Sequence, residues 1–241
     1  RYKFAILAFT KSVYMDQQII NLYDEYTHKP LSRQEFLGRL AKLAGSTTAA
    51  MALLPMLELN YAHASTVQEA DLFTERISYP GAKGDMQAYL ARPKKEAKYP
   101  AIIVIHENRG LNAHIEDVTR RAANAGYLAI APNALSPLGG TPANEDDART
   151  LFQQLNAEDS LLNFIKVFDY LPGRNDYNGH AGCVGFCWGG SMANKLAVNV
   201  PSLQAAVAFY GGQPNAADVP KIKAAVQLHY AGLDERVNAG I

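Results

Sequence analysis

This 241-residue sequence has few cysteines and a formal net charge of zero. Its two cysteines, Cys183 and Cys187, are too few for a disulfide framework. No second ligand pair lies at metal-binding spacing from them, so they do not indicate a zinc site. The 23 basic residues balance 23 acidic ones, which argues against a surface that attracts nucleic acid or an anionic membrane. No run reaches the roughly 18 apolar residues that a membrane span needs.

The composition that remains, 48% apolar and 19% charged residues, is that of a folded protein. We divide the chain into an N-terminal extension, residues 1–64, and a domain, residues 65–241. The sequence begins with an arginine, and Met15 is its first methionine. We interpret residues 1–14 as lying upstream of the natural start. Apolar side chains at helical spacing predict a short helix over residues 16–28.

The rest of the extension has the parts of an export signal. Residues 32–37 read S-R-Q-E-F-L, which resembles the S-R-R-x-F-L of a twin-arginine signal with Gln34 in place of the second arginine. An uncharged apolar stretch at 43–57 and an A-H-A sequence at 62–64 follow. We therefore expect a periplasmic protein. The alternative is a cytoplasmic protein in which this segment is an ordinary helix with a buried apolar stripe.

The domain alternates strand and helix signals. Short apolar runs predict strands, and longer stretches with one apolar face predict helices. The alternation predicts one three-layer α/β domain with a mostly parallel sheet, in which ligands bind at the carboxyl ends of the strands. The predicted strands are 74–79, 86–91, 101–105, 127–131, 181–186, 205–210 and 225–230, of which the first two form an antiparallel pair. The predicted helices are 115–125, 145–156, 158–171 and 189–199.

The sharpest motif lies between a predicted strand and a predicted helix. Residues 185–190 read G-F-C-W-G-G, the G-x-S-x-G nucleophile elbow with Cys187 in the serine position. Glycines allow the tight turn that exposes the nucleophile. The helix N-terminus favours a thiolate and points N–H groups at a developing oxyanion. Cys187 is therefore the candidate nucleophile, whereas Cys183 lies within the strand and is expected to be buried and inert.

A second motif, H-E-N-R-G, follows the strand 101–105. A zinc-protease H-E-x-x-H motif is excluded, because Arg109 stands where the second histidine is needed. Glu107 is the candidate to hold or take the thiol proton. The backbone N–H groups of Asn108 and Trp188 are the candidate oxyanion donors. The alternative is an ordinary polar loop with solvated charges.

Asp234 ends a third motif, A-G-L-D, just past the last predicted strand. An acid at this place fits the carboxylate that orients a catalytic histidine, and the alternative is an exposed turn aspartate. Two further residues stay open. Arg109 either meets a substrate carboxylate or faces solvent, and Trp188 either walls an acyl pocket or packs under the elbow.

Together, these motifs resemble the dienelactone hydrolase family of α/β-hydrolases. H-E-N-R-G-L, G-F-C-W-G-G and A-G-L-D occur in the family's order, and the N-terminal segment resembles that of exported members. The resemblance implies that Cys187 attacks an ester or lactone carbonyl, that Glu107 activates the thiol, and that Asp234 is the triad acid. It implies an acyl-enzyme, small-molecule ester or lactone substrates such as dienelactone, and no metal or organic cofactor.

The triad histidine of this family should follow Asp234, but all six histidines of the sequence precede it, at positions 28, 63, 106, 114, 180 and 229. By strand alternation, His106 should point away from Glu107 and be packed or hydrogen-bonded. We expect His229 to pack within its strand. We therefore expect a truncated chain that lacks the last strand and helix of the fold. Three functions follow: a cysteine hydrolase, an inactive truncated remnant, or a small-molecule binding module. The oligomeric state is left open.

Truncation of this kind predicts an uncovered edge at the strand 225–230 and an exposed apolar sheet face. We expect the 241-residue chain to be less stable, and to associate more readily, than a full-length relative. Size-exclusion chromatography with light scattering and a thermal scan measure both properties. A sharp monomer peak with a high, reversible melting temperature would overturn this expectation.

Overall fold

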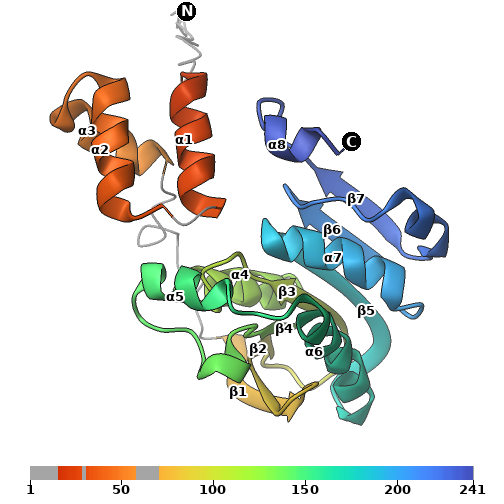
Figure 1. Cartoon of the computed structure of the whole chain (residues 1–241). Coiled ribbons are helices and arrows are strands. Elements are labelled where there is room, and N and C mark those ends of the chain that lie inside the picture. Colours follow the sequence, from red (N-terminus) through yellow and green to blue (C-terminus); the bar gives the residue numbers. More distant parts are fainter. Residues whose placement is uncertain (1–15, 29–30, 58–70, 241) are drawn as a thin grey trace, which may run out of the picture. The chain divides into compact units, whose positions relative to one another are not determined.

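A computed structural model describes residues 16–28, 31–57 and 71–240 of the chain (Figure 1). These residues fall into two compact units, one within residues 1–59 and the other within residues 60–241. In the described parts, no helix is long and apolar enough to cross a lipid bilayer.

The first unit contains three helices with a core of their own: α1 (Gln17–His28), α2 (Arg33–Ala44) and α3 (Thr47–Leu57). Ser32 caps α2 by accepting a hydrogen bond from the Glu35 N–H, and Gly45 ends it in the left-handed conformation. Phe36 is fully buried and stacks on Tyr26, with ring centroids 4.2 Å apart. The twin-arginine-like stretch is thus helical. The A-H-A sequence lies outside the described residues, and export stays a prediction.

The second unit is built on a seven-stranded sheet with the order β1-β2-β4-β3-β5-β6-β7. The pairs β1–β2 and β2–β4 are antiparallel, and the other pairs are parallel. All seven predicted strands are present. Their bounds are β1 (Leu72–Pro80), β2 (Asp85–Pro93), β3 (Tyr99–Ile105), β4 (Leu128–Pro132), β5 (Tyr177–Phe186), β6 (Ala205–Phe209) and β7 (Ala225–His229).

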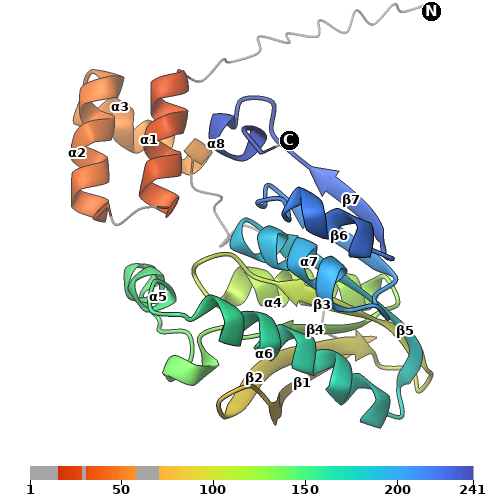
Figure 2. The ribbon, with the colours of Figure 1, turned by 45° about the vertical axis from the view of Figure 1, so that its right-hand side comes forward.

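Helices cover both faces of this sheet, which confirms the predicted three-layer α/β fold. Figure 2 shows α6 and α7 in front of the sheet and α4 behind it. The predicted helices are present as α4 (Ala113–Asn124), α5 (Glu145–Phe152), α6 (Ala157–Tyr170) and α7 (Trp188–Asn199). The prediction for α5 ran four residues too far, because Asn156 caps the next helix by accepting from the N–H groups of Glu158 and Asp159. A short helix, α8 (Glu235–Asn238), was not predicted.

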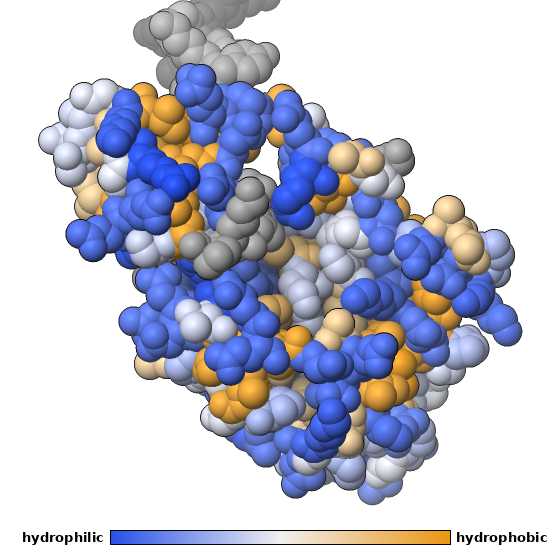
Figure 3. Space-filling view, in the orientation of Figure 1, coloured by the Kyte–Doolittle hydropathy of each residue, from blue (hydrophilic) through white to orange (hydrophobic). Residues whose placement is uncertain are grey.

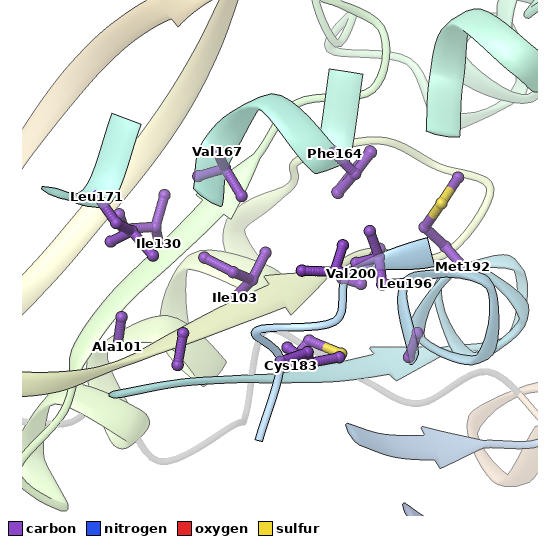
Figure 4. Packing of buried hydrophobic residues seen from close by; sticks show 14 of the residues in the cluster. Ala101, Ile103, Ile130, Phe164, Val167, Leu171, Cys183, Met192, Leu196 and Val200 are labelled. Carbon is purple, nitrogen blue, oxygen red and sulfur yellow. The ribbon is translucent and has the colours of Figure 1, made fainter. Parts of the chain in front are cut away.

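The larger core lies between the sheet and the pair α6 and α7 (Figure 4). Side chains from both helices, such as Phe164 of α6 and Leu196 of α7, pack there on residues of the middle strands such as Ile103 of β3. Cys183 lies in the same core with 1% of its surface exposed, and burial raises the pKa of its thiol to about 12. The prediction that Cys183 is buried is therefore confirmed. A second cluster packs α4 against the other face.

The strand β7 is an edge of the described sheet, as predicted for the strand 225–230. All five of its residues are exposed. Val226 and Leu228 retain 40% and 44% of their surface, which leaves apolar groups at this edge in contact with solvent. Elsewhere, on the face drawn in Figure 3, hydrophilic residues cover most of the surface and hydrophobic ones form small, separate patches.

At the amino end of β5, a charged network ties three strands together. Arg174 donates to both carboxylate oxygens of Asp176, each at 2.8 Å, and to Glu75 of β1 at 3.0 Å. Arg92 of β2 pairs with Asp176 at 2.9 Å. Burial opposes ionisation of Asp176, but the hydrogen bonds and charges of the two arginines outweigh it and lower its pKa.

Replacing Asp176→Asn should cost about 2 kcal/mol of unfolding free energy at pH 7, because two partly buried arginines lose their partner. Since folding lowers the pKa of Asp176, this stabilisation is present above about pH 4 and is lost as the pH falls through the lower, folded value. Urea unfolding of both proteins at pH 7 and at pH 3 measures the difference.

The matched control is Asp218→Asn, which breaks the exposed ion pair between Asp218 and Lys221. We expect no measurable loss there, because exposed pairs are screened by solvent. Equal effects of the two substitutions, or a difference at Asp176 that is as large at pH 3 as at pH 7, would contradict this assignment.

Candidate active site

The register of the parallel strands β3 and β5 places two candidate residues at the carboxyl ends of neighbouring strands. Ile105 of β3 pairs with Gly185 of β5. Glu107 and Cys187 each stand two residues further along, so they leave adjacent strands at the same level. Neighbouring strands are about 4.8 Å apart. The structure therefore brings the loops that carry the predicted base and the predicted nucleophile together.

Cys187 has the backbone conformation of a nucleophile elbow. Its φ and ψ are 54° and −115°, a region that residues with a side chain rarely adopt. It directly precedes α7, and its N–H donates to the Phe209 carbonyl at 3.0 Å. Trp188 is the first residue of α7, where a backbone N–H has no acceptor within the helix. The predicted strand-turn-helix is thus present, with helix N–H groups beside the thiol.

Glycine is required at this turn because backbone segments meet there. A Cβ at Gly185 would overlap the Gly189 carbonyl group. A Cβ at Gly189 would overlap the carbonyl oxygens of Ile105 and His106. The first turn of α7 therefore lies directly against the loop that follows β3.

Both ring nitrogens of His106 are hydrogen-bonded to backbone groups, so this side chain is not placed to act as a base. Its Nε2 accepts from the Ala134 N–H at 3.0 Å, so the proton is on Nδ1, which donates to the Glu107 carbonyl at 2.5 Å. Complete burial lowers its pKa to about 4. The prediction of a hydrogen-bonded, packed His106 is confirmed.

The Trp188 side chain packs under the elbow, which is one of its two predicted alternatives, and a place in an acyl pocket stays a prediction. The indole stacks on the His106 ring at 5.8 Å and meets the rings of Phe152 and Phe164 edge-on at 4.8 Å and 5.7 Å. This aromatic cluster fixes the elbow against α5 and α6. His229 also stacks, on Phe209 at 4.3 Å, but it remains exposed on β7.

Glu107 accepts a hydrogen bond from the Tyr210 hydroxyl group at 2.9 Å. Tyr210 follows β6, and sequence reasoning did not single it out. His114, near the start of α4, also senses Glu107. Burial lowers the pKa of His114, whereas the negative charges of Glu107 and Asp117 oppose that change. The loop after β3 is thus hydrogen-bonded to the residue after β6 and interacts electrostatically with α4, in addition to lying beside β5.

Arg109 does not face solvent, so that alternative was wrong. Only 11% of its side chain is exposed, and it pairs with Glu145 at the start of α5 at 2.9 Å. Asn108 lies beside it in the same turn, half-buried. The ion pair with Glu145 holds this loop against α5. The sequence alone did not indicate that Arg109 pairs with Glu145, because the two residues are 36 positions apart.

Asp234 precedes α8 and caps it, since its carboxylate accepts from the Val237 N–H at 2.9 Å. Gln213, in the loop after β6, donates to the Val237 carbonyl at 3.2 Å and ties α8 to that loop. The predicted acid therefore lies past β7, at the start of a helix that is tied to the loop after β6. Within the described residues, no three His, Cys, Asp or Glu side chains gather as a metal ion would need.

Substituting Gly189→Ala should lower the unfolding free energy by about 3 kcal/mol, because the added methyl group meets two backbone carbonyls that cannot rotate away. Gly173→Ala is the matched control, since a Cβ at Gly173 meets nothing within 4 Å. It should change stability by less than about 0.5 kcal/mol. Urea titrations give both values, and equal losses would show that the approach of α7 to β3 is not tight.

Comparison with known proteins relates this site to a family. Residues 86–240 match the model of the dienelactone hydrolase family. The "Putative hydrolase fragment YghX" of Escherichia coli K12 is 48% identical over 112 residues, which cover 44% of this chain and 96% of that protein. A "Putative carboxymethylenebutenolidase" of Salmonella typhi is 40% identical over 139 residues, or 56% of this chain. The alignment spans 51% of that protein, so this chain covers about half of its length.

A solved structure supports the same relationship. The "Putative Dienelactone Hydrolase" from Klebsiella pneumoniae is 29% identical, with a TM-score of 0.56 over 65% of this chain and 71% of that chain. The matched residues contain the loops of Glu107, Cys187 and Asp234 and make up well over half of the sequence. The fold is that of the α/β-hydrolases, and this chain belongs to the dienelactone hydrolase family.

Proposed function

We propose that this protein hydrolyses small esters or lactones through an acyl-enzyme on Cys187. The observation that carries the proposal is the strained backbone of Cys187 at the N-terminus of α7, one strand away from the carboxylate of Glu107 and at the same level of the sheet. This backbone conformation destabilises the folded protein, and such strain is found at functional sites more than at inert core positions.

In the acylation step, Glu107 accepts the proton of the Cys187 thiol, and the sulfur attacks the carbonyl carbon of the substrate. The carbonyl electron pair moves to oxygen, where the N–H groups of Trp188 and Asn108 stabilise the oxyanion. Collapse of this intermediate breaks the carbon–oxygen bond. Glu107 returns its proton to the departing alkoxide, and a thioester on Cys187 remains.

In the second step, water attacks the thioester, Glu107 takes a proton from the water, and the thiol leaves with that proton. The product is a carboxylic acid, and both residues return to their starting states. In the family pattern, Asp234 would orient a histidine base. Here both proton transfers are assigned to Glu107, because its loop leaves the sheet beside that of Cys187 and at the same level. Slow release of the acyl group is then expected, because a single carboxylate serves both steps.

The Cys187→Ala variant tests the proposal with p-nitrophenyl acetate as the ester. The wild-type protein should release a burst of about one equivalent of p-nitrophenol, followed by a slower phase. Without the thiol, the burst should vanish, and the acylation rate should fall on the order of 10³-fold or more. Stopped-flow absorbance measures the burst, and mass spectrometry measures the acetyl group on the protein.

Cys183→Ala is the control, because that thiol lies in the core and should not react. A burst of equal size in Cys187→Ala would overturn the assignment of the nucleophile. A binding module would give saturable ligand binding with no burst in the wild-type protein, and an inactive remnant would give neither.

A further inference from the structure

A hydrogen bond crosses the end of the strand that carries Cys187. Glu107 follows β3 and Tyr210 follows β6, and β5 lies between these two strands. The Tyr210 hydroxyl nevertheless donates to Oε1 of Glu107 at 2.9 Å. The phenol therefore bridges the carboxyl end of β5, where the elbow begins. A hydrogen bond between loops two strands apart needs both loops to be held in place.

The backbone of Tyr210 is held in a conformation that requires such support. Of the described residues other than glycine, only Cys187 and Tyr210 have positive φ angles, 54° and 40°. The Tyr210 N–H donates to the His229 carbonyl at 2.8 Å. Two residues further on, the Gly212 N–H donates to the Ser191 hydroxyl at 2.7 Å, on the first turn of α7. The strained residue is thus fixed from both sides, by β7 and by α7.

The loop after Tyr210 is attached to the elbow's own helix by further contacts. Asn194 donates to the Gly212 carbonyl at 3.0 Å, and a Cβ at Gly211 would overlap the Ser191 backbone. Both strained residues, Cys187 and Tyr210, therefore depend on the first turns of α7. A side chain placed with this much backbone support and aimed at the candidate base is unlike a tyrosine that merely fills the surface.

We propose that Tyr210 is a positioning residue that holds the Glu107 carboxylate in place and oriented toward the Cys187 thiol. The proposal rests on the function proposed above. A phenol O–H stabilises the carboxylate relative to the carboxylic acid, because it donates a hydrogen bond that the acid form accepts less well. It also limits rotation of the Glu107 side chain. Tyr210 touches no reacting atom in this scheme and acts through Glu107.

Other charged and titratable groups also lie near Glu107 and contribute to its electrostatic surroundings. His114 of α4 interacts with the Glu107 charge. Arg109, on the same loop, is engaged by Glu145 of α5. His106 is buried and donates to the Glu107 backbone carbonyl, and its low pKa of about 4 keeps it neutral near neutral pH. Cys187 itself lies on the β5 side.

The test is the pH dependence of the acylation burst with p-nitrophenyl acetate in Tyr210→Phe, which removes the hydroxyl group and keeps the ring. The acid limb of the burst-rate profile should move to higher pH by about half to one pH unit, because the carboxylate loses a neutral hydrogen bond. At pH values below the limb, the burst rate should fall roughly three- to tenfold.

Three variants make the result specific. In Glu107→Gln, the acid limb should disappear, and adding Tyr210→Phe to that variant should have no further effect on the burst rate. His114→Gln should retain an acid limb, which assigns the limb to Glu107 rather than to His114. Tyr79→Phe removes another hydrogen-bonded phenol, which donates to the Asn163 carbonyl. It should lower the melting temperature and leave the profile unchanged.

The two proposals fail in different ways. A burst that survives Cys187→Ala overturns the function. A Cys187-dependent burst whose acid limb does not move in Tyr210→Phe overturns the positioning role and leaves the function intact. A lower melting temperature with an unmoved limb shows that Tyr210 only supports the fold. Equal effects of Tyr210→Phe with and without Glu107 would likewise overturn the role, because Tyr210 would then act by another route.

Discussion

The close approach of the first turn of α7 to the ends of β3 and β6 is the constraint on which the site depends. Gly189 leaves room for the carbonyl groups of β3, and Gly211 leaves room for the backbone of α7. This contact bends the chain at Cys187 into a conformation with φ of 54°. It also brings the loop of Glu107 and the loop of Tyr210 to the same helix end. The positions of Cys187, Glu107 and Tyr210 therefore all depend on one backbone packing arrangement.

Residues of the same type lie in different surroundings in this fold. Cys183 and Cys187 are four residues apart, but strand geometry places the first in the core, where its pKa rises to about 12, and the turn places the second at the sheet edge. His106 is enclosed completely and stays neutral, whereas His114 lies within reach of the Glu107 charge. For Cys183 and His106, burial disfavours the charged form of the side chain, which raises the pKa of the thiol and lowers the pKa of the imidazole.

The strands and the elbow were predictable from the sequence because each depends on local signals. Apolar β-branched runs indicate buried strands, and G-F-C-W-G-G indicates a tight turn wherever it occurs. Tyr210 and the ion pair of Arg109 with Glu145 were not predictable. Each arises from contacts between segments that are far apart in the chain or from backbone strain, and neither leaves a periodic pattern. A tyrosine followed by two glycines at a strand end was the one available signal for Tyr210.

The position of Asp234 is set by a local contact. Its carboxylate caps α8, so its position follows from the turn after β7 and needs no histidine to hold it. Gln213 links α8 to the loop of Tyr210, and Ser191 links that loop to the elbow. The contacts of α8 therefore continue, through the loop of Tyr210, to Glu107 and to the helix that follows Cys187. The backbone of Tyr210, which contacts the candidate base, is thus held by β7, a strand that pairs with one neighbour in the described sheet.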